Sequence, residues 1–132
     1  TKFLGAFITS GIVAGLIHSL LNPSTSVPLI GASGAIFGII AVLFLLMPFK
    51  ITYALMIPLP ALAVGLMLSI VELYSIYAQT DLTIAHDAHI AGFVYGLIYA
   101  FTVDKKRALK GLLIALAVLA AMYYIGVTFD LI

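Results

Sequence analysis

Five apolar segments, separated by short polar or proline-containing stretches, divide the chain. They comprise residues 3–21, 34–47, 57–77, 88–103 and 109–127. A helix of about 20 apolar residues spans the roughly 30 Å hydrocarbon core of a bilayer. The second segment is shorter than the others, so its first residues are expected to lie below the membrane surface. The pattern predicts an all-α, polytopic transmembrane helix bundle forming a single domain over residues 1–132.

The composition strengthens this interpretation and excludes several function classes. Hydrophobic residues make up 64% of the chain and charged residues 8%, and the mean hydropathy is +1.28. These values lie outside the range of soluble domains. Cysteine is absent, which excludes disulfides and thiolate metal sites. The sequence contains no metal-ligand, phosphate-binding or nucleic-acid motif, so we expect no metal, no cofactor and no nucleic-acid partner.

The distribution of basic residues predicts the orientation in the membrane. If the five segments alternate in direction, all six basic residues fall on one side: Lys2, Lys50, Lys105, Lys106, Arg107 and Lys110. The positive-inside rule makes that side cytoplasmic. The connections 22–32 and 78–87 contain no Lys or Arg and lie on the other side. We expect a multi-pass integral protein of a cell membrane, with the start of the second segment toward the extracytoplasmic side.

Ser33 lies at that start, within the stretch Gly-Ala-Ser-Gly-Ala-Ile-Phe-Gly at residues 31–38. Free backbone N–H groups and the positive end of the helix dipole at such a position can stabilise developing negative charge. Taken alone, a serine here is explained better by helix capping and packing than by catalysis.

His89 lies at the start of the fourth segment and shares one helix face with Gly92 and Gly96. The second segment has Gly34 and Gly38 at the same four-residue spacing. Such small-residue faces let helix backbones approach closely in lipid, although a glycine pair alone indicates only packing. Packing these two faces together would bring His89 beside Ser33, where imidazole can act as a general base toward a hydroxyl nucleophile.

These residues resemble the motifs of the rhomboid intramembrane serine proteases. Residues 31–38 resemble the family's GxSGxxxG motif, and residues 88–96 resemble its AHxxGxxxG motif. The resemblance implies that Ser33 is the nucleophile and His89 the base, with no acidic third member required. It also implies that Phe37 packs on the catalytic imidazole and that Ser33 supplies an oxyanion-hole N–H. The remaining expected support residues of the site are Gly31, Gly34, Gly38, Gly92 and Gly96.

The resemblance covers the family core from its third helix onward, and the segment at 109–127 resembles an added C-terminal helix. The two preceding core helices, the second of which holds an HxxxN motif that contributes to the oxyanion hole, are expected upstream of this chain. The resemblance further implies that the loop at 78–87 covers the site and that the third segment is a movable wall for substrate access.

Five further polar residues have more than one interpretation. His18 and Asn22 have HxxxN spacing but precede Ser33 too closely to belong to the family's second helix; we expect a local polar contact for His18 and a helix end at Asn22. Glu72 lies within an apolar segment, where a carboxylate needs a partner, and we expect a structural bond to His86 or to loop backbone. His86 is otherwise expected to reach the aqueous surface, and Asp87 to cap the fourth helix.

The predicted function is that of an intramembrane serine endopeptidase, which cleaves transmembrane substrate helices near their extracytoplasmic end by a Ser-His dyad. The alternative is a non-catalytic rhomboid-like protein that binds transmembrane clients. A small transporter or channel has little support, because few ionisable residues lie in the apolar segments. The sequence indicates neither the natural substrate nor the oligomeric state.

Overall fold

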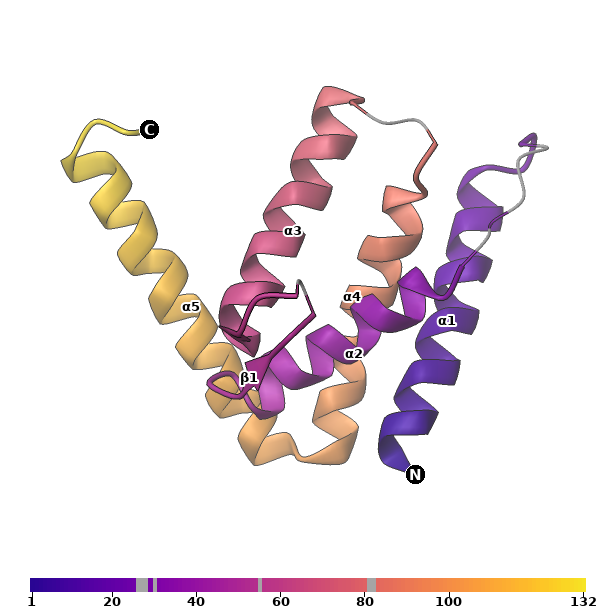
Figure 1. The fold of residues 1–132 in the computed structure, drawn as a ribbon, viewed down its shortest axis with the longest axis horizontal. Coiled ribbons are helices and arrows are strands. Elements are labelled where there is room, and N and C mark those ends of the chain that lie inside the picture. Colours follow the sequence, from indigo (N-terminus) through magenta and orange to yellow (C-terminus); the bar gives the residue numbers. More distant parts are fainter. Residues whose placement is uncertain (26–28, 30, 55, 81–82) are drawn as a thin grey trace.

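The computed structural model describes residues 1–25, 29, 31–54, 56–80 and 83–132. The helices are α1 (Lys2–Leu21), α2 (Ser33–Leu46), α3 (Ala61–Ala78), α4 (His86–Val103) and α5 (Lys105–Thr128). A short antiparallel hairpin of β1 (Ile51–Thr52) and β2 (Leu59–Pro60) connects α2 to α3. Figure 1 shows the axes of α1, α3 and α4 roughly parallel, with α4 running opposite to α1 and α3 and with α2 crossing obliquely between them. The predicted all-α architecture is confirmed.

Helices α1, α3 and α5 are each long and apolar enough to cross a membrane, whereas the apolar α2 has only 14 residues. Many large apolar side chains on their outer faces are exposed. Such surface is unfavourable in water but is the expected covering of helices that face acyl chains. The chain is therefore an integral membrane protein whose surrounding medium is the lipid bilayer.

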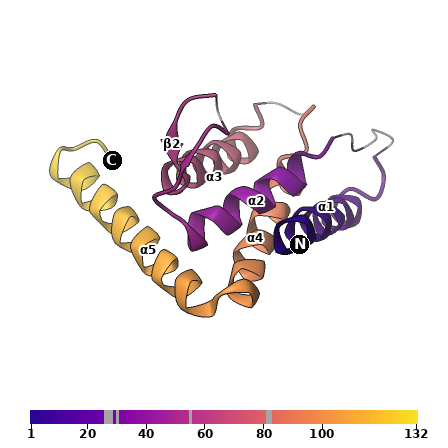
Figure 2. The same ribbon diagram turned by 60° about the horizontal axis from the view of Figure 1, so that its bottom comes forward.

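Helix α2 is the centre of the bundle and contacts each of the other four helices (Figure 2). Nine of its residues are buried, including Gly34 and Gly38. A Cβ built on Gly34 would lie 2.6 Å from Cβ of Ala14 in α1, and one built on Gly38 would overlap the side chain of Ser10. Small residues thus let α1 approach α2 closely, as expected where no hydrophobic effect drives helix association.

Ser10 gives a testable consequence of this close packing. It is fully buried, and its hydroxyl has no hydrogen-bond partner among the described residues. An unpaired buried hydroxyl costs free energy, so Ser10→Ala is expected to raise the free energy of unfolding by about 1 kcal/mol.

Thermal unfolding in detergent measures this effect. The matched control is Ser69→Ala, which removes a hydroxyl that does donate to a carbonyl, that of Gly65 at 2.7 Å. A Ser10→Ala protein less stable than wild type would show that the hydroxyl has a stabilising partner.

Helix α5 packs against the bundle mainly through its first half. Ala108, Gly111 and Ala115 are buried there, and Gly111 meets the backbone of Leu45 in α2. Beyond this contact α5 diverges from the bundle (Figures 1 and 2). The groove that opens between α3 and α5, about 340 Å³ in volume, is lined by apolar side chains such as Leu66 and Val118.

Two helix starts differ from the prediction by four residues, and the other boundaries by two residues or fewer. The third helix begins at Ala61 and not at residue 57, because Pro58 and Pro60 hold the residues before them in extended conformations and favour the short hairpin. The fifth begins at Lys105 and not at residue 109, because Asp104 caps it by accepting a hydrogen bond from the backbone N–H of Arg107 at 3.1 Å.

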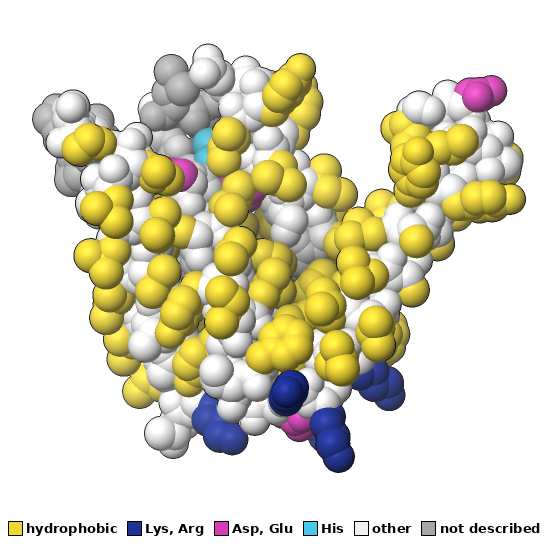
Figure 3. Space-filling view, turned by 180° about the vertical axis from the view of Figure 1, so that it is seen from behind, with side chains coloured by type: hydrophobic (Ala, Val, Ile, Leu, Met, Phe, Trp, Pro, Cys, Tyr) yellow, Lys and Arg dark blue, Asp and Glu magenta, His cyan; other side chains and the backbone are white. Residues whose placement is uncertain are grey.

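Lys and Arg side chains gather at one end of the molecule (Figure 3). This end contains the start of α1, the loop after α2 and the junction of α4 with α5, with Lys2, Lys50 and Lys105 among its residues. The start of α4 lies toward the other end, and α2 starts about midway between the two ends (Figure 1).

Candidate active site

Ser33 is the first residue of α2, where the chain turns sharply into the helix. Gly31 has a φ of +111°, which other residues rarely adopt, and this glycine therefore permits the turn. The N-cap position is Ala32, which provides no side-chain cap. The Ser33 hydroxyl contacts a side chain from another helix, so the capping interpretation of this serine is wrong. The backbone N–H groups of the first residues of a helix have no intrahelical partner. In α2, the first of these groups is the N–H of Ser33.

His89 contributes its imidazole from the first turns of α4. Its Nε2 lies 2.8 Å from Ser33 Oγ, and its ring stacks on Phe37 with a centroid separation of 4.4 Å and an angle of 9° between the planes. The His89 side chain is only 12% exposed. Stacking and burial therefore restrict the imidazole to an orientation in which one nitrogen faces the serine hydroxyl.

The glycines of α2 and α4 set the register that brings these side chains together. A Cβ on Gly92 would overlap the carbonyl oxygen of Gly34, and one on Gly96 would overlap that of Gly38. The two glycines of α2 thus meet the two glycines of α4 at matching four-residue intervals. Ser33 directly precedes the first glycine of α2, and His89 lies about one turn before the first glycine of α4. This is the packing that the sequence predicted.

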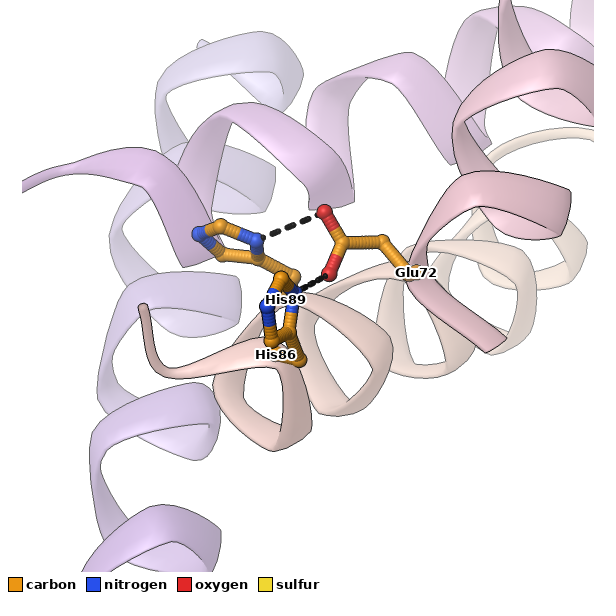
Figure 4. A group of neighbouring side chains, drawn as sticks. All are labelled: Glu72, His86 and His89. Atoms are coloured by element: carbon orange, nitrogen blue, oxygen red, sulfur yellow. Dashed lines mark hydrogen bonds and ion pairs between the residues drawn. The ribbon is translucent and has the colours of Figure 1, made fainter. Parts of the chain in front are cut away.

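Glu72 completes a buried polar cluster with the two histidines of α4 (Figure 4). Its Oε1 lies 3.0 Å from His89 Nδ1, and its Oε2 lies 2.5 Å from His86 Nδ1. The predicted contact with His86 is present. The contact with His89 was not predicted, and the expectation that His86 reaches the aqueous surface is wrong, since its side chain is 11% exposed.

A second polar cluster joins the end of α1 to the start of α4. His18 Nδ1 lies 2.9 Å from both carboxylate oxygens of Asp87, and the Asn22 side-chain amide donates to Asp87 Oδ2 at 2.9 Å. Asp87 is not the cap of α4, whose N-cap is Ala85. The expected local contact of His18 is present, since the Asn22 side-chain amide lies 3.3 Å from His18 Nδ1, but the shorter contact to Asp87, 69 residues away, was not predicted. Asn22 follows the last residue of α1, as expected.

The first cluster also contains the donor set of a metal site. Each of Glu72, His86 and His89 offers one ligand atom, and these three atoms lie within 4.8 Å of one another. Two imidazoles and one carboxylate are suitable ligands for zinc. The sequence spacing did not indicate this set. However, a metal-bound imidazole normally donates its other N–H to a partner, and His86 Nε2 is buried without one among the described residues. The hydrogen-bonded cluster is the better supported interpretation.

Two segments next to the site are only partly described. The predicted cover loop at 78–87 includes residues 81 and 82, and the loop before Ser33 includes residues 26–28 and 30; these positions lie outside the described residues. The geometry given above therefore uses only the described residues of these segments, such as Gly31, His86 and Asp87.

Phe37 offers a test of how strongly stacking restrains the imidazole. Phe37→Ala removes the ring that stacks on His89 and is expected to lower kcat for any reaction of Ser33 by roughly two- to tenfold, since an aromatic pair contributes about 0.5–1.5 kcal/mol beyond burial. Phe37→Tyr keeps the stacking and should retain most activity. Equal rates for wild type and Phe37→Ala would show that stacking does not position the base.

Comparison with known proteins identifies the family of this chain. A family model described as the Rhomboid domain matches residues 1–106, which include all of α1 to α4 but only the first residues of α5. Searches of curated proteins and of solved structures found no match. The matched region is most of the 132-residue chain and contains both Ser33 and His89. The chain therefore belongs to the rhomboid family.

Proposed function

We propose that this protein is an intramembrane serine endopeptidase that uses Ser33 as nucleophile and His89 as general base. The observation that carries the proposal is the 2.8 Å contact between His89 Nε2 and Ser33 Oγ in a largely buried setting. A nucleophile within hydrogen-bond reach of an oriented base is the basic arrangement of serine hydrolases. Membership of the rhomboid family is consistent with this chemistry.

The reaction follows from the positions of these groups. His89 Nε2 takes the proton of Ser33 Oγ as the oxygen attacks the scissile carbonyl carbon, and the protonated imidazole then gives this proton to the leaving amine. The Ser33 N–H, at the positive end of α2, donates to the oxyanion of the tetrahedral intermediate. A water molecule, deprotonated by the same imidazole, releases the acyl product and regenerates the serine.

The location of the pair supports transmembrane helices as the substrate class. Helix α2 begins well below the upper ends of α1 and α3 (Figure 1), so Ser33 lies at a depth that a soluble peptide reaches less readily than a membrane-spanning one. The basic side chains gather at the opposite end (Figure 3), which by the positive-inside rule is cytoplasmic. We infer cleavage near the extracytoplasmic end of the substrate helix, in a cell membrane.

The experiment uses the intact protein reconstituted into proteoliposomes with a single-span substrate. The expected result is two fragments from wild type, with the cut mapped by mass spectrometry to the extracytoplasmic part of the substrate span, and none from Ser33→Ala. A substrate that co-purifies with wild type and is never cut would overturn the proposal in favour of a client-binding protein.

A further inference from the structure

Glu72 is the buried ionisable group that the two-residue mechanism leaves without a role. The other buried residues of α3 are Ala61, Leu62, Val64 and Gly65, all in its first turns, whereas Glu72 lies two turns beyond Gly65. It is 6% exposed, while its neighbours Val71 and Leu73 are more than half exposed. A carboxylate is costly at such a position in a membrane protein, so its partners indicate what it does.

Both partners are imidazole nitrogens, so the charge of the carboxylate determines which nitrogens carry protons. An ionised carboxylate only accepts hydrogen bonds, so with Glu72 ionised Nδ1 of His89 and Nδ1 of His86 would each donate an N–H to it (Figure 4). A neutral imidazole protonated at Nδ1 has its lone pair on Nε2. In His89 this lone pair faces Ser33 Oγ, so the serine hydroxyl donates to it. This tautomer is the one that a general base requires.

The charge of Glu72 matches the next step of the reaction. When His89 accepts the proton of Ser33, the imidazole becomes positively charged while Nδ1–H still donates to Glu72 Oε1 at 3.0 Å. An ionised Glu72 would stabilise this imidazolium, because the pair is largely shielded from solvent. No proton moves to Glu72.

His86 holds the carboxylate in this orientation. It binds the second oxygen, Oε2, and lies one helical turn from His89 on α4, with the two rings nearly perpendicular at 89°. Its Nε2 has no hydrogen-bond partner among the described residues. Within that part of the chain, the bond to Glu72 is therefore the only hydrogen bond that restrains the His86 ring. The two histidines therefore direct one carboxylate oxygen each, and α3 is linked to the base on α4.

We propose that Glu72 is a positioning residue that selects the His89 tautomer and stabilises its protonated form, so that the site operates as Ser33–His89–Glu72. This inference rests on the proposed function and adds an acidic member that the resemblance of the motifs did not require. The competing explanation is structural: Glu72 would only fasten the upper half of α3 to α4.

Glu72→Gln and Glu72→Leu separate these explanations in reconstituted intact protein. Gln keeps the shape without the charge, whereas Leu keeps apolar contact in the bundle without any acceptor. For both variants we expect kcat on a single-span substrate to fall by roughly 10²- to 10⁴-fold with KM unchanged, because the lost interaction acts on the base and not on substrate binding. Ser69→Ala, one turn from Glu72 on α3, is the matched control and should retain wild-type kcat.

A second measurement does not depend on activity. The ¹⁵N chemical shifts of the histidine rings distinguish a protonated from an unprotonated nitrogen, and we expect His89 to be protonated at Nδ1 in wild type and to lose this preference in Glu72→Leu. A protein that cleaves nothing but shows this change would contradict the proposed function and keep the positioning role. Wild-type kcat in Glu72→Gln, or an unchanged His89 tautomer in Glu72→Leu, would overturn the inference.

Discussion

Ser33→Ala and His89→Ala are each expected to lower kcat for cleavage of a transmembrane substrate by at least about 10⁴-fold. Ser33→Ala removes the oxygen that forms the acyl-enzyme. His89→Ala removes the nitrogen that lies 2.8 Å from this oxygen and takes its proton. The rates are measured in proteoliposomes at saturating substrate, with folding verified by thermal unfolding of each variant.

The double variant sharpens this prediction. Because nucleophile and base act as a unit, Ser33→Ala combined with His89→Ala should be no slower than either single variant. Ser19→Ala is a matched control, since its hydroxyl donates to the Gly15 carbonyl within α1 at 2.9 Å and is remote from the dyad in sequence. Near wild-type cleavage by either single variant would contradict the assignment of roles, and additive losses would show that the two residues act separately.

Gly92→Ala is expected to lower the free energy of unfolding by about 2–3 kcal/mol and to reduce activity with it. The new Cβ would overlap the carbonyl oxygen of Gly34, and backbone on both sides of this contact leaves no flexible side chain that can move away. Helices α2 and α4 would have to separate, which would move His89 away from Ser33.

Gly15→Ala provides the comparison for Gly92→Ala. Gly15 is also within a helix, but a Cβ there meets its nearest heavy atom, Cδ2 of Leu29, at 3.8 Å, an ordinary van der Waals distance. Since alanine is intrinsically better than glycine in a helix by about 1 kcal/mol, Gly15→Ala should be neutral or stabilising. Equal thermal stabilities of the two variants would argue against close α2–α4 packing.

The sequence predicted the helices and the Ser33–His89 pairing for identifiable reasons. Uninterrupted apolar segments determined the helices, and the regular spacing of Gly34, Gly38, Gly92 and Gly96 left one way to pack α2 on α4 closely. The boundaries that were wrong lie where local chemistry outweighs hydropathy, at the prolines before α3 and at the Asp104 cap of α5.

The contact of Glu72 with His89 and the contacts of Asp87 could not be predicted in the same way. Helix α3 is apolar on nearly all sides, so its sequence does not specify which face turns toward the bundle, and only the folded arrangement directs Glu72 at both histidines. Similarly, the bonds of His18 and Asn22 to Asp87 depend on how far α1 extends relative to the start of α4. The spacing of residues along the chain specifies neither which face of α3 turns toward the bundle nor how far α1 extends relative to α4.

The most direct test of the catalytic assignment is covalent labelling of the intact protein by a fluorophosphonate probe, followed by mass spectrometry of the modified peptide. The probe reacts with a hydroxyl only when a base and an oxyanion site activate it. We predict one adduct on Ser33 in wild type, none in Ser33→Ala, and strongly slowed formation in His89→Ala. No adduct on Ser33 in folded wild-type protein, or labelling that persists in Ser33→Ala, would contradict the account.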